Sequence, residues 1–229
     1  MNKGLFLLFF LNIFLSAQVT VTETASLNEP KILQVETGTL YENINSTAEN
    51  IFLPTISYHF ALNKKLEFIF LNNIIYKINE EKNETEFPVS LGLKTPFINK
   101  NNTQISVAGF ITGQKNDLGK TVFNTSSYFL ITQEINSKLT LESNLGITYD
   151  NTLKSFIKEY SAVGIFKLNP KLNAFLEYFG SFCNNENPKH QFNSGISYSL
   201  KNNLQLNANY GMGLSANAPR YFIYLGTSF

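Results

Sequence analysis

Five glutamates lie in stretches where polar and apolar residues alternate, so each carboxylate shares a strand face with other polar side chains. They are Glu36, Glu67, Glu142, Glu159 and Glu177. Lys94 and His59 have the same parity. Carboxylates around a narrow passage favour cations or polar neutral solutes. In a small closed structure such charges can instead pair with one another and fill the interior, and the pattern leaves both possibilities open.

Asparagines extend this polar face. Asn144 follows Glu142 by two residues, and Asn207 and Asn209 alternate with apolar neighbours near the carboxyl terminus. Side chains two positions apart on a strand point to the same side. We therefore expect a polar interior lined by Glu36, His59, Glu67, Lys94, Glu142, Asn144, Glu159, Glu177, Asn207 and Asn209.

Catalytic chemistry has little support in the sequence. Ser57 lies two residues before His59, which could place a nucleophile beside a base, but this spacing is common by chance and both residues have interior parity. Cys183 is the only cysteine, so no cysteine metal cluster or disulfide framework can form. The sequence also lacks metal-ligand spacings, phosphate loops and dinucleotide fingerprints. We expect no catalytic residues, metal or cofactor, and therefore not an enzyme.

The strand pattern that positions these residues is clearest in LQLNANYGMGL, residues 204–214. Apolar residues such as Leu206 and Tyr210 alternate with Asn207, Asn209 and Gly211 over eleven positions. About ten alternating residues are what a tilted transmembrane β-strand requires. This stretch therefore predicts a membrane-spanning strand with Leu206 towards lipid and Asn207 towards the interior.

About twelve segments show this alternation, and an even number is expected of a bacterial barrel. We expect an all-β fold, a membrane-spanning antiparallel up-and-down β-barrel over residues 31–229. The expected strands are 32–41, 51–62, 65–76, 87–97, 103–112, 122–134, 138–150, 155–168, 171–182, 190–200, 203–213 and 219–229.

Every second connection between these segments is a short turn containing Asn and Lys, as in LNKK at 62–65 and LNPK at 168–171. Asn tolerates left-handed backbone angles, and Lys opposes edge pairing. The other connections tend to be longer and strongly polar, as in KINEEKNETE at 77–86. Short periplasmic turns alternating with longer outer loops are typical of outer-membrane barrels, so we assign the Asn/Lys turns to the periplasmic side.

The amino terminus reads as an export signal. Lys3 precedes the apolar run LFLLFFLNIFL, and Leu15-Ser16-Ala17 forms a cleavage site before Gln18. We expect a cleaved signal peptide over residues 1–17 and a polar periplasmic lead-in over 18–30.

Composition agrees with an exported membrane barrel. The net charge is +1, which gives no reason to expect a nucleic-acid partner. Aromatic residues make up 14% and charged residues 15% of the chain, a balance suited to a surface that contacts lipid. We expect the bacterial outer membrane as the location, its lipid as a partner and a small solute as a possible ligand. The sequence leaves the oligomeric state open.

Five stretches resemble a known family. They are LQVETGT at 33–39, LPTISYHFALNKKLEF at 53–68, LESNLGITYD at 141–150, AFLEYFG at 174–180 and LQLNANYGMGLS at 204–215. The chain resembles the outer-membrane proteins named for the meta pathway of phenol degradation. The resemblance implies a barrel of this size and the transport of small organic compounds, and it implies no catalytic residues.

These observations predict a porin-like channel or transporter for small organic or polar solutes. The alternatives are a structural or adhesive barrel with a plugged lumen and, less favoured, an outer-membrane hydrolase. Two strands joined by the loop 77–86 also allow a more detailed expectation. If that loop closes symmetrically, Glu67 and Lys94 lie opposite each other and form an ion pair that helps to fix the strand register.

Overall fold

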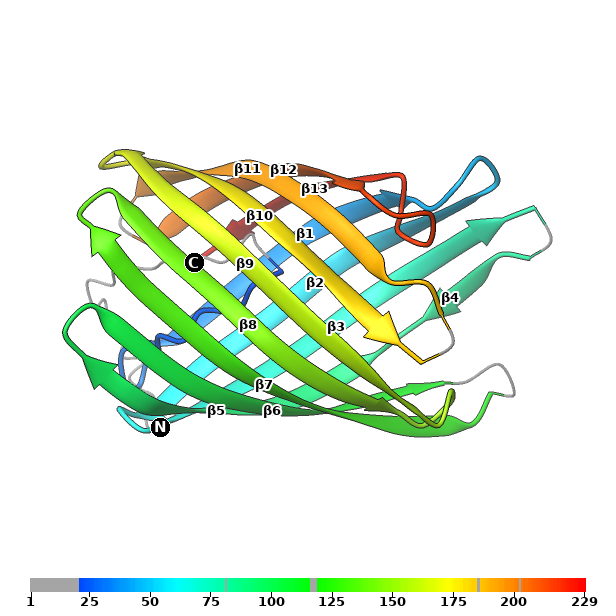
Figure 1. Cartoon of the computed structure of the whole chain (residues 1–229), viewed down its shortest axis with the longest axis horizontal. Helices are drawn as coiled ribbons and strands as arrows, with labels where there is room; N and C mark the ends of the chain where they lie inside the picture. Colours follow the sequence, from blue (N-terminus) through cyan, green and yellow to red (C-terminus); the bar gives the residue numbers. More distant parts are fainter. Residues whose placement is uncertain (1–20, 81, 116–118, 185, 202) are drawn as a thin grey trace, which may run out of the picture.

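The structure is a computed structural model that describes residues 21–80, 82–115, 119–184, 186–201 and 203–229. The expected signal peptide over residues 1–17 lies outside the described residues and stays a prediction. The described chain forms a closed antiparallel β-barrel, in which consecutive strands pair and β1 closes the ring against β13 (Figure 1). The predicted all-β barrel is confirmed.

The strands follow the alternating segments closely. They are β1 (Leu33–Asn43), β2 (Ala48–Asn63), β3 (Leu66–Asn79), β4 (Glu84–Glu86), β5 (Val89–Lys100), β6 (Thr103–Lys115), β7 (Thr121–Asn136), β8 (Leu139–Asp150), β9 (Ser155–Asn169), β10 (Leu172–Cys183), β11 (Lys189–Lys201), β12 (Leu204–Gly213) and β13 (Tyr221–Ser228).

The strand predicted over 87–97 begins earlier and is interrupted, because the short strand β4 lies in the stretch 77–86 that the sequence predicts as a loop. Both β4 and β5 pair with β3, so the two together occupy one position in the ring and the barrel has twelve positions. The interruption falls at Phe87 and Pro88. Proline lacks a backbone N–H and cannot donate to the ladder, which explains the break at this point.

The short Asn/Lys turns gather at one end of the barrel, and three of them are closed in the same way. The side-chain oxygens of Asn63, Asn136 and Asn169 each accept a hydrogen bond from the backbone N–H two residues later, at 2.8–2.9 Å. In a fourth turn Asn101 adopts a left-handed backbone angle, with φ of 54°. Asparagine provides both the side-chain acceptor and the tolerance of a left-handed backbone angle, so the local sequence specifies these turns.

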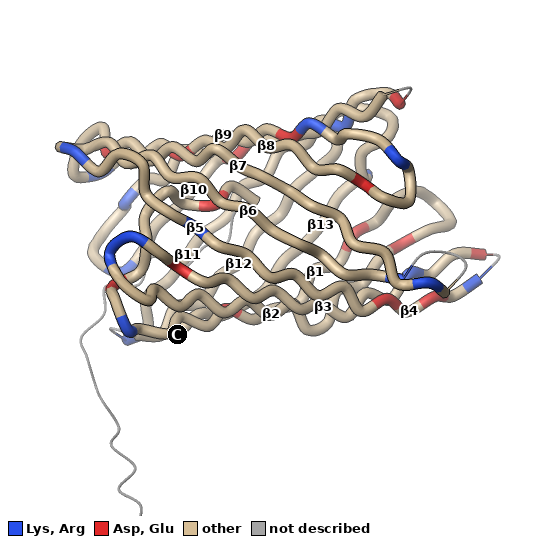
Figure 2. The backbone as a smooth tube through the Cα atoms, turned by 90° about the horizontal axis from the view of Figure 1, so that it is seen from below, with Lys and Arg blue, Asp and Glu red and all other residues tan. Residues whose placement is uncertain are grey.

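The two faces of the wall differ in the expected way. On β8, Leu145 is 62% exposed, whereas Glu142 and Asn144 are 8% and 6% exposed. Charged residues gather mainly at the two ends of the barrel, while the outer belt between them is largely uncharged (Figure 2). Among the described residues, no helix has the length and apolar character needed to cross a membrane.

Residues 21–32, which we call the inner segment, lie inside the barrel (Figure 1). Thr22, Ala25 and Ile32 are buried, and the segment leads into β1 through Lys31, whose N–H donates to the carbonyl of Ala61 at 2.8 Å. The sequence predicts a periplasmic lead-in over 18–30. Of its described residues, Glu29 and Pro30 are exposed, whereas those from Thr22 to Asn28 instead lie in the lumen. Their polar groups find partners on the interior wall there, as described next.

Candidate functional site

The inner segment is attached to the wall by hydrogen bonds to residues far away in sequence. The N–H and the hydroxyl of Thr22 both donate to Glu177 Oε1 on β10 at 2.7 Å. The N–H of Ala25 donates to Thr132 Oγ1 on β7 at 3.0 Å. Its carbonyl accepts from the Ser106 hydroxyl on β6. The segment therefore joins strands on several sides of the lumen.

A cluster of four ionisable side chains, Glu23, His59, Glu67 and Lys94, forms the centre of this attachment. Lys94 Nζ lies 2.9 Å from both Glu23 Oε1 and Glu67 Oε1, and His59 Nδ1 lies 3.2 Å from Glu67 Oε1. The N–H of Asn28 donates to Glu67 Oε2 at 2.7 Å. Glu67 and Lys94 are directly opposite in the register of β3 and β5, so the predicted cross-strand pair is confirmed.

The same cluster offers ligand atoms that a metal ion could use. One ligand atom from each of Glu23, His59 and Glu67 lies within 4.8 Å of the others. Lys94 already places its ammonium group against both carboxylates. Because this ammonium supplies the positive charge that the carboxylates require, we assign the cluster an ion-pairing role.

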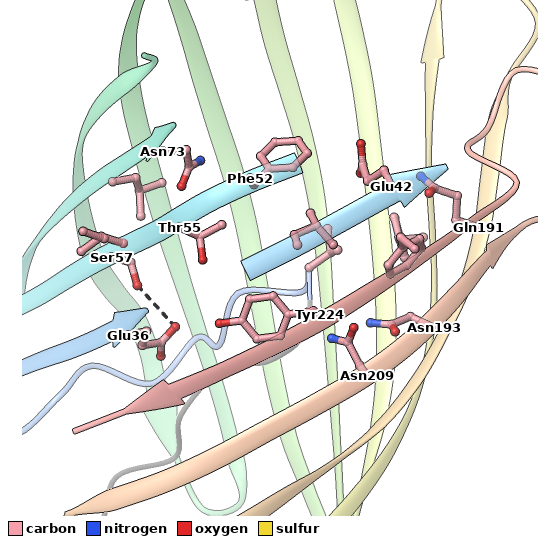
Figure 3. A pocket seen from close by; sticks show the side chains of 16 residues that line it. Glu36, Glu42, Phe52, Thr55, Ser57, Asn73, Gln191, Asn193, Asn209 and Tyr224 are labelled. Carbon is pink, nitrogen blue, oxygen red and sulfur yellow. Dashed lines mark hydrogen bonds between the residues drawn. The ribbon is translucent and has the colours of Figure 1, made fainter. Parts of the chain in front are cut away.

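The lumen contains two adjacent chambers that extend towards its outer end. The first has a volume of about 340 Å³ and extends past Glu36, Glu42 and Asn193 (Figure 3). The second has a volume of about 480 Å³ and is bordered by Glu23, Asn144 and Glu159. The chambers adjoin because Val21, Leu71, Phe179 and Gln191 line both of them.

Aromatic rings form part of the chamber walls, and glycines on neighbouring strands make room for them. Opposite pairs in the register are Gly92 with Phe110, Gly146 with Tyr128, and Gly211 with Phe222. A Cβ atom added at each of these glycines would overlap the opposite ring. The rings therefore lie along the wall, and the space beside them stays open.

β2 provides a further aromatic residue through an irregularity in its pairing with β3. Strict alternation back from His59 would turn Leu53 inwards, but the register shifts between Phe52 and Thr55. As a result, Phe52 lines the first chamber, whereas Leu53 is 49% exposed on the outside. Such a bulge changes which side chain faces the interior.

The predicted lining residues fall into three groups. His59, Glu67 and Lys94 form the ion cluster, and Glu177 holds Thr22. Glu142 accepts from Thr132 at 3.3 Å, and Asn207 contacts Gln205 and Ser228. The residues that border the chambers are Glu36, Asn144, Glu159 and Asn209. Contact with a solute stays a prediction for all of them.

Sequence reasoning missed two features of the lumen. The inner segment is not predicted there, although its polar residues Thr22, Thr24 and Ser26 are suited to a polar lumen. The inward aromatic residues Phe110, Tyr128, Phe179 and Phe222 were also missed. Phe110, Tyr128 and Phe222 each lie opposite a glycine on the adjacent strand. That glycine could have indicated an inward ring, but the strand register is needed to know which glycine lies opposite.

The Ser57 and His59 pair does not form a nucleophile with its base. The hydroxyl of Ser57 donates to Glu36 Oε2 at 3.3 Å, while His59 pairs with Glu67. The two side chains therefore take part in separate contacts, which argues against the hydrolase alternative.

A closed barrel with an apolar outer belt and a polar lumen defines an integral β-barrel protein of the bacterial outer membrane. A family model described as the MetA-pathway of phenol degradation matches residues 114–229, about half of the chain. The chain belongs to this family. No curated protein matches the chain in sequence.

Solved outer-membrane barrels share the fold at low sequence identity. An outer membrane channel from Pseudomonas putida F1 has a TM-score of 0.66 and 10% identity, covering 89% of this chain and 97% of that one. The NanC porin has a TM-score of 0.63 and 9% identity, covering 86% and 99%. The KdgM porin in complex with disordered oligogalacturonate has a TM-score of 0.60 and 8% identity, covering 86% and 98%.

Proposed function

We propose that this protein is a channel for small organic solutes across the outer membrane. The observation that carries the proposal is the pair of adjacent chambers in the lumen. Their volumes of about 340 and 480 Å³ fall within the roughly 300–1,000 Å³ typical of small-molecule sites. Aromatic rings and a few polar groups line both chambers, a combination suited to organic solutes that carry some polar atoms.

Several solved barrels of the same fold are named as porins or channels, which supports the proposal. One of them was solved with an oligogalacturonate, so that protein takes an organic solute. For this chain we expect Glu36, Asn144, Glu159 and Asn209 to contact the solute. Passage also requires the inner segment to leave space at the periplasmic end.

The inner segment favours a second candidate, a barrel that remains closed and serves a structural or adhesive role. The segment bonds to β6, β7 and β10 and occupies the periplasmic half of the lumen. A recess of about 260 Å³ beside Ser26, Asn28 and Gln104 adjoins it at the periplasmic rim.

Single-channel conductance of the refolded full chain in planar bilayers separates these candidates. A channel gives discrete current steps, and proteoliposomes that contain it take up small aromatic alcohols faster than protein-free liposomes corrected for passive leak. Correct folding is checked first by a gel shift between boiled and unboiled samples, because a closed barrel resists detergent unfolding. Folded protein with no conductance and no added uptake would establish the closed barrel instead.

A further inference from the structure

The charges lining the outer chambers are all of one sign. The first chamber is bordered by the carboxylates of Glu36 and Glu42. The second is bordered by those of Glu159 and Glu23, of which Glu23 is paired with Lys94 at 2.9 Å. Among the described residues that line either chamber there is no Lys, Arg or His. The basic groups nearby lie elsewhere: Lys94 and His59 belong to the ion cluster, and Lys189 interacts with Glu42 at the outer end of β11.

The first chamber also contains a buried hydrogen-bond acceptor without a partner. Asn193 is 1% exposed, and its amide nitrogen donates to Glu177 Oε2 at 2.9 Å. A carboxylate only accepts hydrogen bonds from such an amide, so this contact fixes which end of the amide is the oxygen. Among the residues that the structure describes, Asn193 Oδ1 has no hydrogen-bond partner, and Asn193 lies at the chamber wall. Buried polar groups are normally hydrogen-bonded, so we expect this acceptor to receive a hydrogen bond from a ligand or a water molecule.

Aromatic faces surround these acceptors. Tyr224 lies between Glu36 and the pair Asn193 and Asn209 (Figure 3). Its ring passes over Gly38 and Gly226, where any Cβ atom would overlap it, so the ring face stays beside the open space. Phe52, Phe179 and Phe222 line the same chamber. Aromatic faces attract cations, and this attraction grows when the site is shielded from water.

We propose that the first chamber binds organic ammonium compounds, with the ammonium group at the Glu36 carboxylate and the aromatic ring of Tyr224, and with the Asn193 amide oxygen, farther along the chamber, accepting from water or from a further donor of the ligand. An ammonium group offers N–H donors and positive charge, which match the acceptors and rings of this chamber. The apolar part of such a ligand packs against Phe179 and Phe222. This proposal names the solute class of the proposed channel. Transport of the ligand depends on the proposed channel function, whereas binding in the chamber does not.

An inorganic cation fits the chamber less well. Glu36 and Glu42 are six residues apart on β1, which places them about 20 Å apart at roughly 3.3 Å per residue. They therefore cannot coordinate one small ion together. The rings of Phe52, Phe179 and Phe222 also contribute no oxygen ligands of the kind that hard cations require.

Three probes with the same ring and chain test the charge preference: 2-phenylethylammonium, 2-phenylethanol and phenylacetate. Binding to the refolded full chain is measured by isothermal titration calorimetry, with protein-free detergent as the blank. We expect the ammonium compound to bind roughly tenfold more tightly than the alcohol, and phenylacetate to bind most weakly. Equal binding of the ammonium compound and the alcohol would overturn the proposal and favour a site for neutral hydroxylated aromatics.

Matched variants locate the site. Glu36→Gln keeps the volume, an acceptor oxygen for Gln34 and an amide N–H that can donate to the Ser57 hydroxyl, but it removes the charge, and it should weaken ammonium binding roughly tenfold. Tyr224→Leu removes the ring and should also weaken it. Glu142→Gln is the control, because Glu142 is a lumen carboxylate outside the described lining of both chambers. If Glu142→Gln weakens the affinity for the ammonium compound as much as Glu36→Gln does, the assignment of the site to this chamber is overturned.

Binding and conductance are measured on the same preparations, so the two proposals can fail separately. Conductance without preferential ammonium binding overturns the ammonium site and leaves the channel standing. Ammonium binding without conductance overturns the channel and leaves the site standing. A gel shift on boiling confirms that each variant is folded before either measurement is interpreted.

Discussion

The two halves of the lumen are built on the same twelve-position wall but have opposite contents. In the periplasmic half, Lys94 is paired with two carboxylates and the inner segment occupies the space between the strands. In the outer half, Glu42 and Glu159 border open chambers walled by aromatic rings. The comparison indicates that interior polar residues of one barrel can serve two purposes. In the first half they hold a segment in place, and in the second they face space that a solute can enter.

The largest expected effect comes from removing the inner segment. A chain that begins at Lys31 loses the hydrogen bonds to Glu177, Thr132 and Ser106, and its periplasmic half should become as open as its outer half. We expect single-channel conductance to increase severalfold. A variant with residues 21–28 replaced by Gly and Ser at equal length should give a smaller increase. Unchanged conductance in both folded variants would mean that the segment does not limit passage.

Breaking the ion cluster should destabilise the barrel more than removing a chamber charge. Lys94→Gln leaves the buried Glu67 and the half-buried Glu23 without their ammonium partner, which should cost about 3–5 kcal/mol of unfolding free energy. Glu36→Gln, at the wall of the first chamber, should cost less than about 1 kcal/mol because the glutamine amide can still bond to Gln34 and Ser57. Denaturant titration in detergent measures both. If both variants lose the same unfolding free energy, the ion cluster contributes no more to stability than a chamber carboxylate does.

Filling the outer half from the wall should narrow it. Gly146→Val places a side chain where the Tyr128 ring lies, so the ring must move into the second chamber. We expect a loss of stability of about 1–3 kcal/mol from overpacking, together with reduced conductance. Gly164→Val on β9 is the control, since an added Cβ there meets its neighbours at ordinary contact distances of 3.5 Å or more. If the control reduces conductance equally, the ring is not the cause.

The smallest effect should come from loosening one attachment of the inner segment. Thr22→Val keeps the side-chain volume but removes the hydroxyl that donates to Glu177 Oε1, while the backbone N–H bond to the same oxygen remains. We expect a loss of about 0.5–1.5 kcal/mol and more frequent brief openings in single-channel records. Openings as rare as in the unmodified protein would show that this contact does not hold the segment.

The sequence alone determined most of the wall. Period-two alternation placed Leu145 outside and Glu142 inside, and the Asn/Lys turns marked one end of the barrel, because both signals arise from residues near each other in the chain. The pairing of Glu67 with Lys94 could also be predicted, since a single loop connects their strands and fixes the register within narrow limits.

The tertiary structure decided what the wall encloses. The bond between Thr22 and Glu177 joins residues 155 positions apart, and no local pattern specifies which distant acceptor a polar segment will meet. The inward rings depend in the same way on glycines across the strand pairing, such as Gly146 opposite Tyr128. The bulge that turns Phe52 inwards interrupts the alternation from which its face would be predicted. The contents of the lumen depend on closure of the ring, because only closure brings these distant residues together.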